Sequence, residues 1–213
     1  MNPIAKRTIT ALLTATLVVL AIVYAPAQVF PVAFGILFVL AAFECWQLVA
    51  KRRAPWTPAG LAVLLPALLV LAMAFTVLPT IAVRHSNLMM LYAIAIVKVS
   101  DMGGFALGVA FGRHKLCPSI SPNKSWEGLF GSVLASCIVS CLFVSITHFG
   151  WPKALAFGLL AALVGTAGDL VESKFKRWAG VKDSATFMPA GLGGFLDMFD
   201  SLLFAPAMML PFL

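Results

Sequence analysis

Long apolar stretches alternate along this chain with short polar connections that contain proline and glycine. Seven of the stretches approach twenty residues, which is the helix length needed to cross the hydrocarbon core of a bilayer. They cover residues 8–24, 31–50, 59–80, 87–111, 129–149, 153–171 and 194–213. The pattern predicts an all-α fold: a polytopic integral membrane bundle of about seven transmembrane helices.

The composition agrees with this pattern and excludes an ordinary soluble domain. Hydrophobic residues make up 62% and charged residues 11% of the 213 residues, and the mean hydropathy is +1.01. Lys6 and Arg7 precede the first stretch as they would in a signal peptide, but Ala25-Pro26-Ala27 is a weak cleavage motif. The first stretch is therefore predicted to be a retained anchor.

The distribution of Lys and Arg predicts the orientation. If the N-terminus is cytoplasmic, twelve of the 15 basic residues lie in cytoplasmic segments, Arg84 and Lys153 lie on the other side, and Lys98 lies within a span. This asymmetry follows the positive-inside rule. The formal charge of +7 is thereby explained by topology, and no nucleic-acid partner is expected.

Acidic residues divide the chain into two regions. Residues 1–86 contain only Glu44, and the other seven acids lie in residues 87–213. The first region is predicted to be a membrane anchor and scaffold. The second is predicted to be the catalytic region, with both belonging to one compact membrane domain.

Two polar connections are predicted to face the cytoplasm, at Gly112–Gly128 and Glu172–Gly194. The first carries side chains suited to binding phosphate, namely Ser121, Asn123, Lys124 and Ser125. Glu127 follows them, and it is equally explained as an acid at the start of a helix. The second connection begins with basic residues and ends in Gly193 and Gly194, where backbone N–H groups can approach a ligand.

Three carboxylates are candidate metal ligands. Asp197 and Asp200 are three residues apart and would share one face of a helix, and Asp169 has an equivalent depth at the end of the sixth stretch. Carboxylates together with phosphate oxygens are typical ligands of Mg²⁺. The alternative is that these acids pair with basic side chains, namely Lys176, Arg177 and Lys182.

Asp101 lies three residues after Lys98, so an ion pair within the membrane and a role at a site are both open. Gly103 and Gly104 follow, and they would let a helix or a ligand approach closely. The three histidines are scattered and are assigned no catalytic role.

Three blocks of sequence in this region form an ordered set. SDMGGFALGVAFGRHKLCPSISPNKSWEG covers Ser100–Gly128, GDLVESKFKR covers Gly168–Arg177 and is followed by Lys182-Asp183, and GGFLDMFDS covers Gly193–Ser201. In these blocks the chain resembles the phosphatidate cytidylyltransferase (CDP-diacylglycerol synthase) family, over about the C-terminal 115 residues. It departs from the family pattern at Leu192, where a histidine is usual, and at Met198, where an arginine is usual.

The resemblance implies transfer of CMP from CTP to phosphatidic acid, giving CDP-diacylglycerol and pyrophosphate. It implies a catalytic group that comprises Asp169, Lys176, Arg177, Lys182, Asp183, Asp197 and Asp200. Within that group, Asp169, Asp197 and Asp200 would hold Mg²⁺ or another divalent cation, with a second cation also open. The implied substrate-binding residues are Asp101, Ser121, Asn123, Lys124, Ser125, Glu127, Ser173, Gly193 and Gly194.

The protein is expected in a bacterial inner membrane, and the distribution of Lys and Arg puts its active site on the cytoplasmic side. Its partners would be CTP, phosphatidic acid and membrane lipids, and a homodimer stays open. Four alternatives remain: a CTP-dependent lipid or polyprenol kinase, a cytidylyltransferase for another lipid phosphate, a non-catalytic membrane paralogue and a small transporter. The products separate the two enzyme classes, because CMP transfer releases pyrophosphate and phosphorylation releases CDP.

Overall fold

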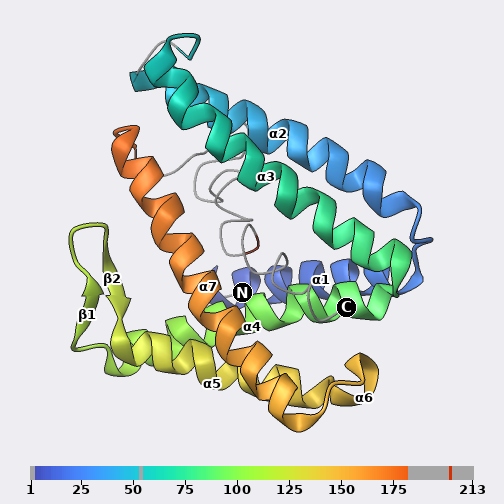
Figure 1. The fold of residues 1–213 in the computed structure, drawn as a ribbon. Helices are drawn as coiled ribbons and strands as arrows, with labels where there is room; N and C mark the ends of the chain where they lie inside the picture. Colours follow the sequence, from blue (N-terminus) through green and yellow to red (C-terminus); the bar gives the residue numbers. More distant parts are fainter. Residues whose placement is uncertain (1–2, 53–54, 182–201, 203–213) are drawn as a thin grey trace.

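The structure is a computed structural model, which describes residues 3–52, 55–181 and 202. Its helices and strands are α1 Pro3–Tyr24, α2 Val29–Arg52, α3 Pro58–Arg84, α4 Asn87–Phe111, β1 Lys115–Cys117, β2 Ser121–Ser125, α5 Trp126–Leu142, α6 Val144–Thr147 and α7 Trp151–Trp178. Figure 1 shows α2 and α3 as an antiparallel pair, α4 beside α5, and α7 crossing α5.

The helical membrane architecture predicted from hydropathy is confirmed. Within the described residues, four helices are long and apolar enough to cross a membrane: α2, α3, α4 and α7. Helix α5, Trp126–Leu142, is apolar but shorter than these four. The predicted span at 194–213 lies outside the described residues, apart from Leu202.

Two predicted connections contain more regular structure than the sequence indicated. The first holds an antiparallel hairpin of β1 and β2, so the fold is not purely helical. The hairpin turn contains Pro118 and is closed by a hydrogen bond from Ile120 N to Cys117 O of 3.2 Å. In the second, α7 continues to Trp178, and a backbone bond from Val181 N to Lys176 O closes its end around Gly180, whose φ is +77°. The start of that connection is therefore helix rather than loop.

The predicted span at 129–149 is divided. Helix α5 ends at Leu142, and the short helix α6 follows it. His148 then takes a left-handed conformation with a φ of 55°, which turns the chain toward α7.

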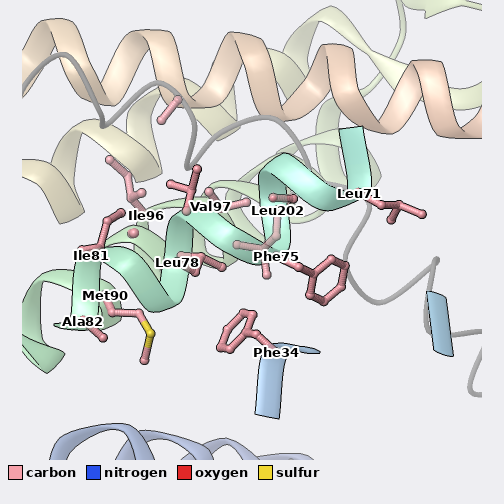
Figure 2. Packing of buried hydrophobic residues seen from close by; sticks show 14 of the residues in the cluster. Phe34, Leu71, Phe75, Leu78, Ile81, Ala82, Met90, Ile96, Val97 and Leu202 are labelled. Carbon is pink, nitrogen blue, oxygen red and sulfur yellow. The ribbon is translucent and has the colours of Figure 1, made fainter. Parts of the chain in front are cut away.

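A buried apolar core lies where α3 packs against α2 and α4. Figure 2 shows side chains of α3, including Phe75 and Leu78, close to Phe34 of α2 and Met90 of α4. The rings of Phe34 and Phe75 have their centroids 6.1 Å apart. Large side chains therefore fill the interface that joins α3 to its neighbours.

Helices α4 and α5 approach through small residues instead. A Cβ atom added at Gly103 would lie 2.5 Å from Ala135 Cβ and 2.6 Å from Gly131 O, so no larger residue fits there. Ser100 Oγ donates to Ser132 O across the same interface, at 3.2 Å. The close approach predicted for Gly103 and Gly104 is confirmed, and the neighbour is a helix.

Two polar contacts hold distant helix ends together. The Arg52 guanidinium at the end of α2 donates to Trp178 O at the end of α7 and lies 5.4 Å from the centroid of the Trp178 ring. Asn87 Nδ2 at the start of α4 donates to Ala25 O just beyond α1, at 2.8 Å. The C-terminal ends of α2 and α7 therefore lie at the same end of the helical bundle.

Candidate functional site

A cavity of about 670 Å³ lies between α4, α5, α7 and the hairpin, which meet at the left of Figure 1. Its polar lining comes from four separate elements, and the residues are Asp101, Lys115, Ser121, Asn123, Lys124, Ser125, Ser132, Thr166 and Asp169. The rest of its described lining consists of glycines and apolar side chains. Six of the predicted site residues are thereby brought to one cavity.

An ion pair between β2 and α7 forms the polar centre of this cavity. Lys124 Nζ lies 2.8 Å from Asp169 Oδ2 and donates a second hydrogen bond to Thr166 O, at 3.2 Å. The side chains are 24% and 20% exposed, so both charges are largely removed from solvent. Removing one partner of a buried ion pair destabilises the protein, because the remaining charge is left buried without compensation.

The second oxygen of Asp169 is available for a ligand. Asp169 Oδ1 is buried, and no described residue donates a hydrogen bond to it. Buried polar atoms are normally satisfied, and an exception calls for an explanation such as a bound ion. A carboxylate with one oxygen held by Lys124 and the other open fits a cation ligand.

Asp101 lines the cavity from α4 and also forms an ion pair with Lys98, at a distance of 3.9 Å between Lys98 Nζ and Asp101 Oδ2. Of the two possibilities left open for Asp101, the structure therefore shows the ion pair, and it also places the residue at the cavity. Because Lys98 is not among the described lining residues, only the aspartate faces the cavity.

Small residues create the space inside the cavity. Gly104 and Gly108 on α4 and Gly112 at its C-cap recur every four residues, and Gly128 of α5 faces the first two. A Cβ atom at Gly128 would lie 2.9 Å from Gly104 O, so a side chain there would force the two backbones apart. These glycines keep the wall of the cavity free of side chains.

Ser125 and Glu127 form the base of the hairpin. Ser125 Oγ accepts the N–H of Gly128 at 3.1 Å and caps α5, while its residue is only 3% exposed. Glu127 Oε1 lies 2.6 Å from His114 Nδ1, and Trp126 N donates to His114 O at 2.9 Å. The backbone N–H of Glu127 and the His114 ring both donate to the Glu127 carboxylate and lower its pKa to about 2. Glu127 therefore anchors the hairpin, and it is not among the described residues that line the cavity.

The basic residues at the end of α7 form contacts outside the described lining of the cavity. Lys176 Nζ lies 2.7 Å from Glu172 Oε2, with the side chains 13% and 3% exposed. Arg177 Nη1 donates to Val181 O at 3.3 Å. Lys176, Arg177 and Ser173 are absent from the described lining of the cavity. Lys176 does pair with an acid, but with Glu172 and not with a predicted metal ligand.

Six predicted site residues lie outside the described residues, namely Lys182, Asp183, Gly193, Gly194, Asp197 and Asp200. Within the part of the chain that the structure describes, no group of three or more His, Cys, Asp and Glu side chains could hold a metal ion. The proposed set of Asp169, Asp197 and Asp200 stays a prediction.

Comparison with known proteins then decides the family. Residues 58–213 match the profile of the Cytidylyltransferase family. The match begins at the start of α3 and covers most of the chain. The chain belongs to the cytidylyltransferase family. This assignment agrees with the resemblance found in the three sequence blocks.

Curated relatives support membership of the cytidylyltransferase family. The chain is 46% identical over 116 residues to the phosphatidate cytidylyltransferase of Staphylococcus aureus (strain COL), an alignment that covers 54% of this chain and 44% of the relative. It is 44% identical over 117 residues to the protein of that name in Staphylococcus haemolyticus (strain JCSC1435), with the same coverage. The matched region thus spans less than half the length of these relatives.

The sequence did not predict three polar residues that line the cavity, Lys115, Ser132 and Thr166, or two that pair with predicted site residues, His114 and Glu172. Glu172 is four residues before Lys176, a spacing that indicates an ion pair on a helix and could have been read from the sequence. His114 and Thr166 have no such signal, because His114 meets Glu127 and Thr166 meets Lys124 only after the hairpin folds back.

Proposed function

We propose that this chain transfers CMP from CTP to phosphatidic acid, giving CDP-diacylglycerol and pyrophosphate. The observation that carries the proposal is the Lys124–Asp169 pair at the polar centre of the 670 Å³ cavity. Membership of the cytidylyltransferase family and the printed name of the curated relatives support the same reaction.

In this reaction a phosphate oxygen of the lipid attacks the α-phosphorus of CTP. A new P–O bond forms, the bond from the α-phosphorus to the bridging oxygen breaks, and pyrophosphate leaves with the electron pair. The attacking phosphate is already an anion near neutral pH, so the site needs no strong general base. What the protein must provide is positioning and neutralisation of charge.

The residues around the cavity suit these two tasks. Lys124 would exchange part of its interaction with Asp169 for a phosphate oxygen of the substrate, because an ammonium group can serve both anions. Ser121 and Asn123 lie on the same strand and would donate hydrogen bonds to the nucleotide. Asp101 would support the site from α4.

Asp169 would also hold Mg²⁺, together with Asp197 and Asp200, and the buried Oδ1 atom of Asp169 fits this role. Carboxylates are hard oxygen ligands of the kind that Mg²⁺ selects. The cation supplies neutralisation of the triphosphate and of the charge that develops on pyrophosphate. Lys176, Arg177 and Lys182 would contribute further positive charge at the same membrane face.

We propose seven spans, a cytoplasmic N-terminus and a cytoplasmic site in a bacterial inner membrane. The Arg52–Trp178 contact supports this orientation, since it holds the basic C-terminal ends of α2 and α7 on one side. In this arrangement residues 1–86 anchor the protein and residues 87–213 carry the chemistry. Labelling of single cysteines placed beyond Arg52 and beyond Arg84 tests it: only the second should react with an impermeant reagent added outside intact cells.

The enzymatic proposal is tested with the purified full-length protein, labelled CTP, phosphatidic acid and Mg²⁺. We expect labelled CDP-diacylglycerol and pyrophosphate from the wild type. Asp169→Asn should lower the rate by at least about 100-fold, in line with the loss of one charge-stabilising group. Lys153→Gln, an exposed change far from the cavity, is the matched control and should keep the wild-type rate.

Three outcomes would contradict this proposal. No labelled liponucleotide from the wild type with several lipid acceptors would refute the enzyme. Release of CDP with a phosphorylated lipid would identify a kinase instead. An unimpaired Asp169→Asn would remove the proposed site.

A further inference from the structure

A second cavity, of about 400 Å³, lies between the N-terminal half of α2 and the C-terminal half of α3. It shares no described lining residue with the first cavity. Nothing in the proposed reaction uses it, so it calls for an explanation of its own.

The walls of this groove are apolar. Phe34 and Phe38 from α2 and Phe75 from α3 line it. The ring centroids of Phe34 and Phe38 lie 6.1 Å and 6.4 Å from that of Phe75. Thr76 and Thr80 also line it, but their hydroxyls donate to carbonyls of their own helix, at 2.7 Å and 2.6 Å. The threonines therefore present mainly their methyl groups, and the interior suits a hydrocarbon chain.

Gly35 keeps the groove open. A Cβ atom added there would meet no atom within 4 Å, whereas Gly103 and Gly128 in the other half of the protein are in tight contact. The space at Gly35 is thus room for a ligand and not a close approach of two backbones.

One end of the groove carries a positive charge. Arg84, the last residue of α3, lines this end and is exposed. In the described part of the chain no carboxylate lies within ion-pair distance of it. A guanidinium group is well suited to binding a phosphate.

The length of the groove matches one leaflet of a bilayer. Its α3 wall runs from Ala72 to Arg84, which is about 18 Å at 1.5 Å per residue. The hydrocarbon core of one leaflet is about 15 Å deep, half of about 30 Å. An acyl chain in the groove would therefore place its headgroup at the level of Arg84.

We propose that this groove binds a membrane phospholipid, with an acyl chain between α2 and α3 and the phosphate on Arg84. Arginine binds phosphate through two parallel hydrogen bonds, which makes the pairing both strong and directional. Helix α4 separates Arg84 from the hairpin by one span, so the lipid belongs to the leaflet opposite the first cavity. The binding is independent of catalysis.

A second copy of this chain is a less suitable occupant. A neighbouring helix would bring apolar side chains to the rings, but it would leave the exposed guanidinium of Arg84 in the interface without a partner. Isolated charges are costly in such an interface. A phospholipid satisfies the charge and the apolar wall at once.

Native mass spectrometry of the full-length protein in detergent, titrated with phosphatidylglycerol, tests the proposal. We expect Arg84→Gln to weaken the binding of one lipid by at least about tenfold, because the charge-assisted hydrogen bonds to the phosphate are lost. Gly35→Leu fills the groove and should remove that lipid. Lys153→Gln removes a charge that the proposed topology puts on the same face, and it should leave binding unchanged. Diacylglycerol with the same acyl chains lacks the phosphate, so it should bind more weakly and equally to the wild type and Arg84→Gln.

Phosphatidylglycerol binding that is equal in the wild type, Arg84→Gln and Gly35→Leu would overturn the proposal. Equal losses in Arg84→Gln and Lys153→Gln would also overturn it, because they would reduce the effect to overall charge. So would a change from dimer to monomer in Gly35→Leu with no loss of lipid, since the groove would then be an interface between copies. Arg84→Gln keeps the test decisive if Gly35→Leu fails to fold.

Discussion

The α2–α3 interface and the α4–α5 interface solve the same packing problem in opposite ways. Phe34, Phe38 and Phe75 fill the first with large side chains, and Leu78 of α3 belongs to the same buried cluster. The second is built from Gly, Ser and Ala, so that the backbones approach until an added methyl group at Gly103 would overlap its neighbours.

The difference shows where chemistry can be placed in an apolar protein. Large apolar side chains seal an interface and leave room only for another hydrocarbon, as in the groove beside Gly35. Small residues leave a wall of backbone and hydroxyl groups, next to which Lys124 and Asp169 can form a polar cavity. The first interface serves stability and the second serves both stability and the site.

The largest expected effect separates function from structure at the polar cavity. We expect Lys124→Gln to lower the rate of CMP transfer about 100- to 1,000-fold, because a group that neutralises developing charge is lost. The double variant Lys124→Gln/Asp169→Asn should regain stability, since no buried charge is left without a partner, but it should stay inactive. Activity is measured by labelled CTP and stability by chemical unfolding in detergent. A double variant with wild-type activity would show that the pair is only structural.

The next effect concerns the large-residue interface. Leu78→Ala should lower the free energy of unfolding by about 3 kcal/mol, the usual result of leaving a cavity in a packed core. Leu69→Ala on the same helix is the matched control, because Leu69 is 66% exposed whereas Leu78 is 2% exposed. The rate per folded molecule should stay unchanged in both variants. A Leu78→Ala protein as stable as the control would contradict the assignment of this interface as the core.

A smaller effect tests the small-residue interface. Gly103→Ala should destabilise the protein by about 1–3 kcal/mol, because overpacking forces the helices apart. Gly165→Ala makes the same change where an added Cβ atom meets nothing within 4 Å, and it should stabilise α7 by up to about 1 kcal/mol. The free energies of unfolding of the two variants are compared in one detergent. Equal values would remove the contrast between the two interfaces.

The smallest effect lies at the base of the hairpin and depends on pH. The pKa of Glu127 is lowered from 4.5 to about 2 by its own backbone N–H and then by the His114 ring, so these hydrogen bonds stabilise the fold above pH 4.5 and are lost as the pH falls toward 2. The thermal midpoint of the wild type should therefore fall more over this window than that of Glu127→Gln. Identical pH profiles for the two proteins would show that Glu127 does not anchor the hairpin.

Prediction from the sequence was most accurate for the long helices. Residues 87–111 were predicted as a span, and α4 covers Asn87–Phe111. Hydropathy reports such elements directly, because most residues in a span are apolar. It does not report an amphipathic continuation such as the last turns of α7, or a hairpin whose backbone bonds depend on a turn at Pro118.

Prediction of the site was partial for a similar reason. Asp169 and Lys124 were assigned to the same site, and the structure joins them at 2.8 Å. Their pairing was not predicted, because they are far apart in sequence and only the folding of the hairpin brings them together. Glu127 was placed among the substrate-binding residues, but it contacts His114 at the hairpin base and is not among the described lining residues.

The sequence by itself determined that this is a helical membrane protein, which regions carry its charge and to which family it belongs. These properties depend on hydropathy, composition and local motifs, which need no contact between distant residues. Only the tertiary structure decided which polar side chains share a cavity, which glycines form a close interface and which one opens a groove. Those outcomes depend on which helices become neighbours, since a charge or a glycine takes its role from the atoms that surround it.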